Sequence, residues 1–142
     1  MIRPPIPDPP YTGGCLCGAV RYCVTNAPID SGYCHCRMCQ KSSGAPLQAS
    51  AEFPLDGFAV IRGEPKAYRS SASALRHFCP DCGSQLTFRM AENPTYISVN
   101  LPTLDRPEML QPRMHIWRES RISWFEVKDE LPHYDREGPP VD

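Results

Sequence analysis

The sequence predicts a mainly β protein, and three observations support that prediction. Short segments with strand character follow one another along most of the chain, separated by turn pairs such as Asp56-Gly57 and Arg62-Gly63. No stretch of 11 or more residues repeats apolar side chains at the spacing of an α-helix. The chain also contains 17 prolines, which fit poorly inside helices and central strands.

Seven segments are expected to form strands. Residues 19–25 alternate, so that Val20, Tyr22 and Val24 share one face while Cys23 lies on the other. The remaining expected strands are 47–51, 58–61, 66–69, 74–78, 85–88 and 96–99.

The length and charge of the chain limit its organisation and its partners. A chain of 142 residues fits one domain with a core of its own. We divide it into a proline-rich arm at 1–10, a domain at 11–128 and a C-terminal tail at 129–142. The formal net charge is −1 and no run of Lys or Arg occurs, so no positive surface for nucleic acid or anionic membranes is expected.

The cysteines are expected to be reduced. The first residues lack the apolar segment of a signal peptide, and no segment approaches the roughly 18 apolar residues of a membrane span, so we expect a cytoplasmic protein. A disulfide framework is the alternative, because eight cysteines is an even number. Cysteine makes up only about 6% of the chain, however, whereas disulfide scaffolds usually exceed roughly 8–10%. Clustering at short spacing favours metal binding.

Three cysteines crowd into six residues at Cys34, Cys36 and Cys39, with the spacing C-x-C-x-x-C. If residues 36–41 form a helical turn ended by Gly44, then Cys36 and Cys39 share a face and Cys34 approaches from the preceding loop. Soft thiolate ligands select zinc, which accepts tetrahedral sites. Three protein ligands leave the fourth position open, which is typical of a reactive zinc rather than a structural one.

Two further cysteine pairs predict a second, closed metal site. Cys15 and Cys17 point the same way if the backbone there is extended, and flanking glycines allow close approach to an ion. Cys79 and Cys82 form a C-x-x-C motif followed by Gly83, which has the shape of a zinc knuckle. The four thiolates together would complete a structural site, so the sequence predicts two zinc ions per chain.

Cys23 and two histidines have open assignments. Cys23 is expected to be a spare thiol, although it is the candidate fourth ligand of the central cluster if that site is closed. His115 is a candidate ligand, a candidate acid–base group, or a structural strand residue beside Trp117. His35 is expected to point away from the metal, because the residues on either side of it point toward the metal.

Four motifs occur in order between about residue 11 and residue 125. They are Gly14-Cys15-Leu16-Cys17-Gly18-Ala19-Val20-Arg21-Tyr22, Cys34-His35-Cys36-Arg37-Met38-Cys39-Gln40-Lys41-Ser42-Ser43-Gly44-Ala45, Phe78-Cys79-Pro80-Asp81-Cys82-Gly83-Ser84 and His115-Ile116-Trp117. In this combination the sequence resembles the glutathione-dependent formaldehyde-activating enzyme family, whose domain is shared by centromere protein V. The resemblance implies a β-tent, a mainly β arrangement of small sheets held together by zinc.

The resemblance also implies an activity and a set of ligands. The structural zinc would lie on Cys15, Cys17, Cys79 and Cys82, and the reactive zinc on Cys34, Cys36 and Cys39, in agreement with the spacing. The implied activity is the formation of S-(hydroxymethyl)glutathione from glutathione and formaldehyde, a reaction classed with carbon–sulfur lyases. The expected partners are therefore a small-molecule thiol and an aldehyde, with no nucleic acid and no membrane.

The predicted chemistry is the activation of a thiol at the central cluster. Three thiolates around zinc leave a net negative charge, which Arg37 and Lys41 nearby would reduce. A bound thiol would lose its proton near neutral pH and attack an aldehyde carbon to give a hemithioacetal. Two alternatives stay open: a non-catalytic carrier of thiol or zinc, and a structural interaction module in which Cys23 closes the second site.

Overall fold

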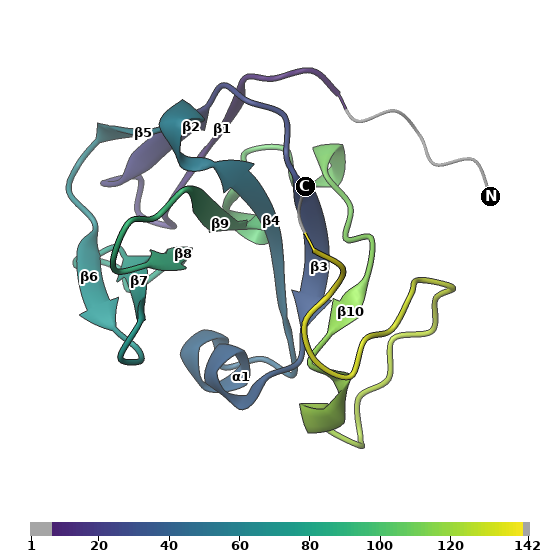
Figure 1. The fold of residues 1–142 in the computed structure, drawn as a ribbon. Coiled ribbons are helices and arrows are strands. Elements are labelled where there is room, and N and C mark those ends of the chain that lie inside the picture. Colours follow the sequence, from purple (N-terminus) through teal and green to yellow (C-terminus); the bar gives the residue numbers. More distant parts are fainter. Residues whose placement is uncertain (1–6, 141–142) are drawn as a thin grey trace.

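The computed structural model describes residues 7–140, and β-strands dominate this part of the chain (Figure 1). The strands are β1 Tyr11–Gly14, β2 Arg21–Val24, β3 Asp30–Cys34, β4 Gln48–Pro54, β5 Phe58–Arg62, β6 Lys66–Arg69, β7 Ala74–Phe78, β8 Gln85–Met90, β9 Tyr96–Asn100 and β10 His115–Ile116. The helical elements are α1 Arg37–Ser43 and the 3-10 turns Leu55–Gly57, Leu101–Thr103, Pro107–Met109 and Arg118–Ser120. The mainly β class predicted from the sequence is confirmed. Of the predicted arm, residues 1–6 lie outside the described part of the chain.

The strands form two sheets. One has three strands in the order β1-β2-β5, and the other has seven in the order β10-β3-β4-β9-β8-β7-β6. Neighbouring strands pair antiparallel, except β10 and β3, which pair parallel. In Figure 1, α1 lies at the end of β3 and β4 that is far from the three-stranded sheet.

The hydrophobic core lies between the two sheets. Tyr22 and Val24 of β2 are fully buried, with Val20 just before them, so the alternation predicted for residues 19–25 is confirmed. The ring of Tyr11 on β1 packs against that of Phe53 on β4, with 5.7 Å between centroids. Burying each such side chain contributes about 2 kcal/mol to folding, so these contacts hold the sheets together.

Each predicted strand corresponds to an observed one. Three observed strands, β1, β3 and β10, were not predicted. β6 and β7 have the predicted bounds, and the other five predictions each overlap a strand. β3 contains Asp30, Ser31 and Gly32, residue types that are rare in strands, and its pairing with β4 and β10 holds it in place. β1 contains Gly13, where a Cβ atom would lie 2.4 Å from the carbonyl oxygen of Thr103, so only glycine fits.

The predicted helical turn is present as α1. The sulfur of Cys36 caps its N-terminus by accepting a hydrogen bond from the N–H of Cys39 (3.3 Å). At its other end Gly44 has a φ of 69° and donates its N–H to the carbonyl of Gln40 (2.8 Å), which confirms the predicted stop. No helix within residues 7–140 is long and apolar enough to span a bilayer.

The segment that the sequence separates as a C-terminal tail returns to β10 (Figure 1, yellow). The N–H of His115 donates to the carbonyl of Pro132 (2.8 Å), and the N–H of Tyr134 donates to the carbonyl of His115 (2.8 Å). Further along, the N–H of Trp117 donates to the carbonyl of Arg136 (2.9 Å). These bonds cover the edge of the larger sheet and bring residues after 128 next to β3 and β10.

Candidate metal centres

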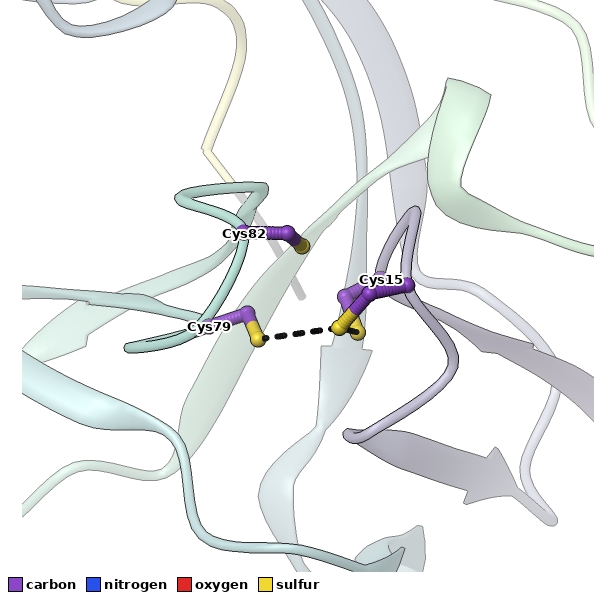
Figure 2. A group of neighbouring side chains, drawn as sticks. Cys15, Cys79 and Cys82 are labelled. Carbon is purple, nitrogen blue, oxygen red and sulfur yellow. Dashed lines mark hydrogen bonds between the residues drawn. The ribbon is translucent and has the colours of Figure 1, made fainter.

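The sulfur atoms of four cysteines lie within 4.8 Å of one another: Cys15, Cys17, Cys79 and Cys82. Figure 2 shows Cys79 and Cys82 on one loop facing Cys15 on another. The Sγ of Cys17 lies 3.6 Å from that of Cys15 and 3.8 Å from that of Cys79. Four sulfurs at about 2.3 Å from a zinc ion lie about 3.8 Å apart at the corners of a tetrahedron, so these separations fit zinc.

The loop that carries Cys15 and Cys17 is a tight turn. The N–H of Gly18, whose φ is 81°, donates to the carbonyl of Cys15 (3.2 Å). The expectation of an extended backbone here is therefore wrong, because the glycine permits a turn that brings the two sulfurs together. The N–H of Val20 also donates to the Cys15 sulfur (3.2 Å), which stabilises negative charge on it.

The loop that carries Cys79 and Cys82 joins β7 to β8. It has the knuckle geometry that its sequence indicates, since the N–H of Gly83 donates to the carbonyl of Cys79 (2.8 Å). The hydroxyl of Ser84 lies 3.2 Å from the Cys82 sulfur. Hydrogen bonding from this hydroxyl, and then from the Ser84 N–H, lowers the pKa of Cys82 to about 5. Cys82 is thus available as a thiolate at neutral pH.

A second group of three sulfurs lies where β3 meets α1. Cys34 ends β3, Cys36 caps α1 and Cys39 lies in its first turn, and their sulfurs are within 4.8 Å of one another. Hydrogen bonds from the thiols of Cys34 and Cys39 lower the pKa of Cys36, whereas contact with Cys36 and Cys39 raises the pKa of Cys34. These contacts and the hydrogen bond from the Cys39 N–H favour the thiolate form of Cys36.

The two clusters differ in the number of sulfurs that they offer. All eight cysteines are free, so the disulfide alternative is not supported. Cys23 lies on β2, opposite Thr12 of β1 and Ala59 of β5, and belongs to neither cluster. Within residues 7–140, no other His, Cys, Asp or Glu joins the group of Cys34, Cys36 and Cys39. The donor sets suit soft metal ions such as zinc, with four sulfurs in one site and three in the other.

Arg76, on β7, contacts the three-sulfur cluster and was not predicted from the sequence. Its guanidinium is buried, with Nη2 3.6 Å from the Cys39 sulfur, Nη1 3.2 Å from Oε1 of Gln48, and the ring of Phe88 5.0 Å away. The nearer arginine in the sequence, Arg37, instead donates to the side chain of Gln40. The pairing of β7 with β8, and of β8 with β9, brings Arg76 to the cluster, so no local pattern indicated it.

Two buried side chains hold the segment that links β3 to α1. Nε2 of His35 lies 2.8 Å from Nδ1 of His115, so His35 contacts β10 rather than the sulfurs, as expected. Gln40, on the buried face of α1, donates to the carbonyls of His35 (2.8 Å) and Ser120 (3.1 Å). These hydrogen bonds fix the backbone between Cys34 and α1 and thereby the positions of the sulfurs.

Comparisons of sequence relate most of the chain to one family. The sequence model of the glutathione-dependent formaldehyde-activating enzymes matches residues 10–120. A Halomonas elongata protein named after the same enzymes is 29% identical over 128 residues, which cover 82% of this chain and 80% of that protein. A Schizosaccharomyces pombe protein named as an uncharacterised lyase is 30% identical over 92 residues, which cover 63% of this chain and 66% of that protein.

A solved structure agrees with the sequence comparisons. The crystal structure of a Rhodobacter sphaeroides protein matches with a TM-score of 0.57 and 28% identity, covering 72% of this chain and 92% of the other. The family match includes the cysteines of both clusters and spans most of the sequence. The chain therefore belongs to the glutathione-dependent formaldehyde-activating enzyme family.

Proposed function

We propose that this protein is a zinc-dependent enzyme that activates a thiol such as glutathione for reversible addition to an aldehyde such as formaldehyde, an activity of the carbon–sulfur lyase class. Family membership supports an enzyme of this kind, and one relative is named a lyase. The main structural support is the group of Cys34, Cys36 and Cys39, because three sulfurs leave one position of a tetrahedral ion for a ligand from outside the protein.

In this proposal the two clusters have different roles. Cys15, Cys17, Cys79 and Cys82 would hold a structural zinc, and Cys34, Cys36 and Cys39 would hold a second zinc. Zinc bound by three thiolates supplies a position at which a thiol loses its proton near neutral pH. In the reaction, the S–H bond of the thiol breaks, a C–S bond forms to the aldehyde carbon, and the proton ends on the former carbonyl oxygen. The reverse reaction breaks that C–S bond.

The protein's own residues would prepare the cluster for this reaction. Arg76 places a positive charge against the Cys39 sulfur in a buried position, where its attraction to thiolate is weakly screened. The hydrogen bond from the Cys39 N–H to Cys36 and the bonds of Gln40 hold two ligands on a short rigid element. The free thiols suit a reducing compartment, and a cytoplasmic location is part of the proposal.

The proposal is tested by hemithioacetal exchange between formaldehyde and a panel of thiols, followed with protein of known zinc content. We expect acceleration with glutathione or a related thiol. Cys36→Ser should abolish this acceleration because it removes a ligand, while Cys23→Ser should retain it because Cys23 lies outside both clusters. If zinc-loaded protein accelerates exchange with none of the thiols, the enzymatic proposal is wrong.

A carrier of thiol is the second candidate, and one observation favours it. Arg76 hydrogen-bonds to the Cys39 sulfur from outside the cluster, the structure shows no other side chain within residues 7–140 in such a bond, and a guanidinium does not exchange protons at neutral pH. A carrier would bind glutathione in calorimetry without any rate effect. The third alternative, in which Cys23 closes the site, is disfavoured because Cys23 is not grouped with the three sulfurs.

A further inference from the structure

A third group of side chains with metal-binding atoms lies outside both cysteine clusters. It consists of His115 on β10 and of Asp129 and His133 on the segment that returns beside it. Their ligand atoms lie within 4.8 Å of one another. Nε2 of His115 is 2.9 Å from Oδ2 of Asp129, and Nε2 of His133 is 4.0 Å from Oδ1 of the same carboxylate. The Asp129 carboxylate therefore faces a nitrogen of each ring.

The backbone holds these three residues together. His115 and His133 lie opposite each other in a parallel bridge, flanked by the hydrogen bonds of His115 with Pro132 and Tyr134. Asp129 turns the chain just before this bridge, because its Oδ1 accepts a hydrogen bond from the N–H of Leu131 (3.0 Å). The arrangement is thus fixed by the fold rather than by flexible surface side chains.

The buried member of the group has the environment of a metal-binding histidine. His115 is fully buried, and its ring stacks against that of Tyr33 with 4.9 Å between centroids. Its Nδ1 faces Nε2 of His35 at 2.8 Å. Without a metal, Nε2 of His115 donates to Oδ2 of Asp129 and Nδ1 accepts from Nε2 of His35. An ion bound at Nε2 would place the proton on Nδ1, and His115 would then donate to His35. A partner at the second ring nitrogen is the usual support of a ligating histidine.

The other two members are reachable from solvent. The side chain of His133 is 42% exposed and that of Asp129 is 23% exposed. The ring of His133 meets that of His115 edge-on, with 4.8 Å between centroids, and its Nε2 lies 4.0 Å from Oδ1 of Asp129. An ion can therefore enter from the exposed side while His115 holds it from within.

We propose that His115, Asp129 and His133 form a third metal site, which binds a divalent first-row transition metal through two imidazoles and one carboxylate. Two nitrogen donors favour zinc, cobalt, nickel or iron(II) over magnesium and calcium, which prefer oxygen ligands. The remaining positions around the ion would be open to water or a small ligand. Because His35 lies between Cys34 and Cys36, the site is linked to the three-sulfur cluster through two hydrogen-bonded rings.

The site is tested by counting zinc ions bound to the full chain in equilibrium dialysis. We expect three ions per chain, with His133→Gln and Asp129→Asn each weakening the third by at least about tenfold, since even loss of a supporting contact costs that much. Glu130→Gln removes a neighbouring exposed carboxylate outside the group and should leave all three ions in place. Both cysteine clusters should remain filled in every variant.

Cobalt provides a second measurement that separates the sites. Cobalt in the third site should add weak absorption without a sulfur-to-metal charge-transfer band, and it should shift the NMR signals of His133. A native protein that binds no more than two ions would overturn the proposal and leave the group as a hydrogen-bonded histidine–aspartate pair. A third ion that stays equally tight in both His133→Gln and Asp129→Asn would overturn it as well.

Discussion

The guanidinium of Arg76 lies 3.6 Å from the sulfur of Cys39, although 37 positions separate the two residues in the sequence. Arg76 is 6% exposed, so its charge is poorly screened by water. Its other contacts, with Gln48 and the ring of Phe88, fix its direction. The fold therefore holds a positively charged side chain next to the three-sulfur cluster, and this charge partly offsets the negative charge of the thiolates.

Replacing Arg76 with methionine should weaken metal binding at the three-sulfur cluster by about tenfold, because a hydrogen bond to a charged group contributes about 1.5 kcal/mol or more. Competition with a chromogenic chelator measures this affinity. The four-sulfur cluster should keep its affinity in the same protein. Arg69→Met is the matched control, because Arg69 is exposed on β6 and donates to the carbonyl of Ala72. Equal affinities in the two variants would show that Arg76 does not support the cluster.

Replacing Cys82 with serine should remove a ligand of the four-sulfur cluster and destabilise the fold. The two loops of this cluster are held together across 61 intervening residues, so we expect a loss of about 4 kcal/mol or more, the range of lost metal sites. Chemical unfolding at saturating zinc measures this loss of stability. Cys23→Ser changes a cysteine outside both clusters, and its free energy of unfolding should stay within about 0.5 kcal/mol of that of the native protein. A large loss in both variants, or in neither, would contradict the assignment.

The cysteine pairs and the central triplet could be predicted from the sequence because the spacing within each is local, and the two pairs could be joined because a structural zinc needs four ligands. C-x-C brings two sulfurs together in an extended segment and in a tight turn, so the pair was predicted correctly although the loop of Cys15 and Cys17 is a turn. The alternation around Tyr22 was equally informative, because a half-buried strand must alternate.

The contacts around the clusters could not be predicted, because they arise from pairing between distant segments. Arg76 reaches Cys39 only once β7 has joined the larger sheet. Asp129 and His133 meet His115 only because the C-terminal segment returns to β10, and that segment shows no strand pattern in the sequence. Asp30, Ser31 and Gly32 form a strand because β4 pairs with all three, while Arg113, just before β10, donates its N–H to the carbonyl of Ser31 (3.0 Å). Tertiary pairing here overrides weak local propensity.

Replacing Gly44 with alanine should destabilise the protein by about 1 kcal/mol, because a left-handed backbone costs an L-residue roughly that much. Gly44 has a φ of 69°, and a Cβ at this position would meet no other atom within 4 Å, so backbone strain is the sole cost. Gly44→Asn should lower the free energy of unfolding by less, since asparagine tolerates this backbone conformation. Urea unfolding of the two variants gives the comparison. If alanine and asparagine are equally tolerated, the left-handed end of α1 is not rigid.

The ion pair between Arg21 and Asp105 should make stability depend on pH in acid. Nη1 of Arg21 donates to Oδ1 of Asp105 (2.8 Å) and Nη2 donates to Oδ2, while Thr12 donates its hydroxyl to the same carboxylate. Hydrogen bonding from Arg21, and then from Thr12, lowers the pKa of Asp105 from 3.8 to about 2. A carboxyl whose pKa is lowered by folding stabilises the protein above its unfolded pKa, and this stabilisation is lost as the pH falls through the folded pKa.

Asp105→Asn should therefore cost up to about 1 kcal/mol at pH 6, a modest value because the pair is partly exposed and screened by water. The difference between native protein and variant should shrink as the pH falls from about 4 toward 2. Thiolate ligands also take up protons in this range, so the two proteins are compared at each pH by urea unfolding under metal-free conditions. Glu64→Gln, at an exposed position just before β6, should show no such convergence. A difference that stays constant down to pH 2 would mean that Asp105 acts through its shape and not through its charge.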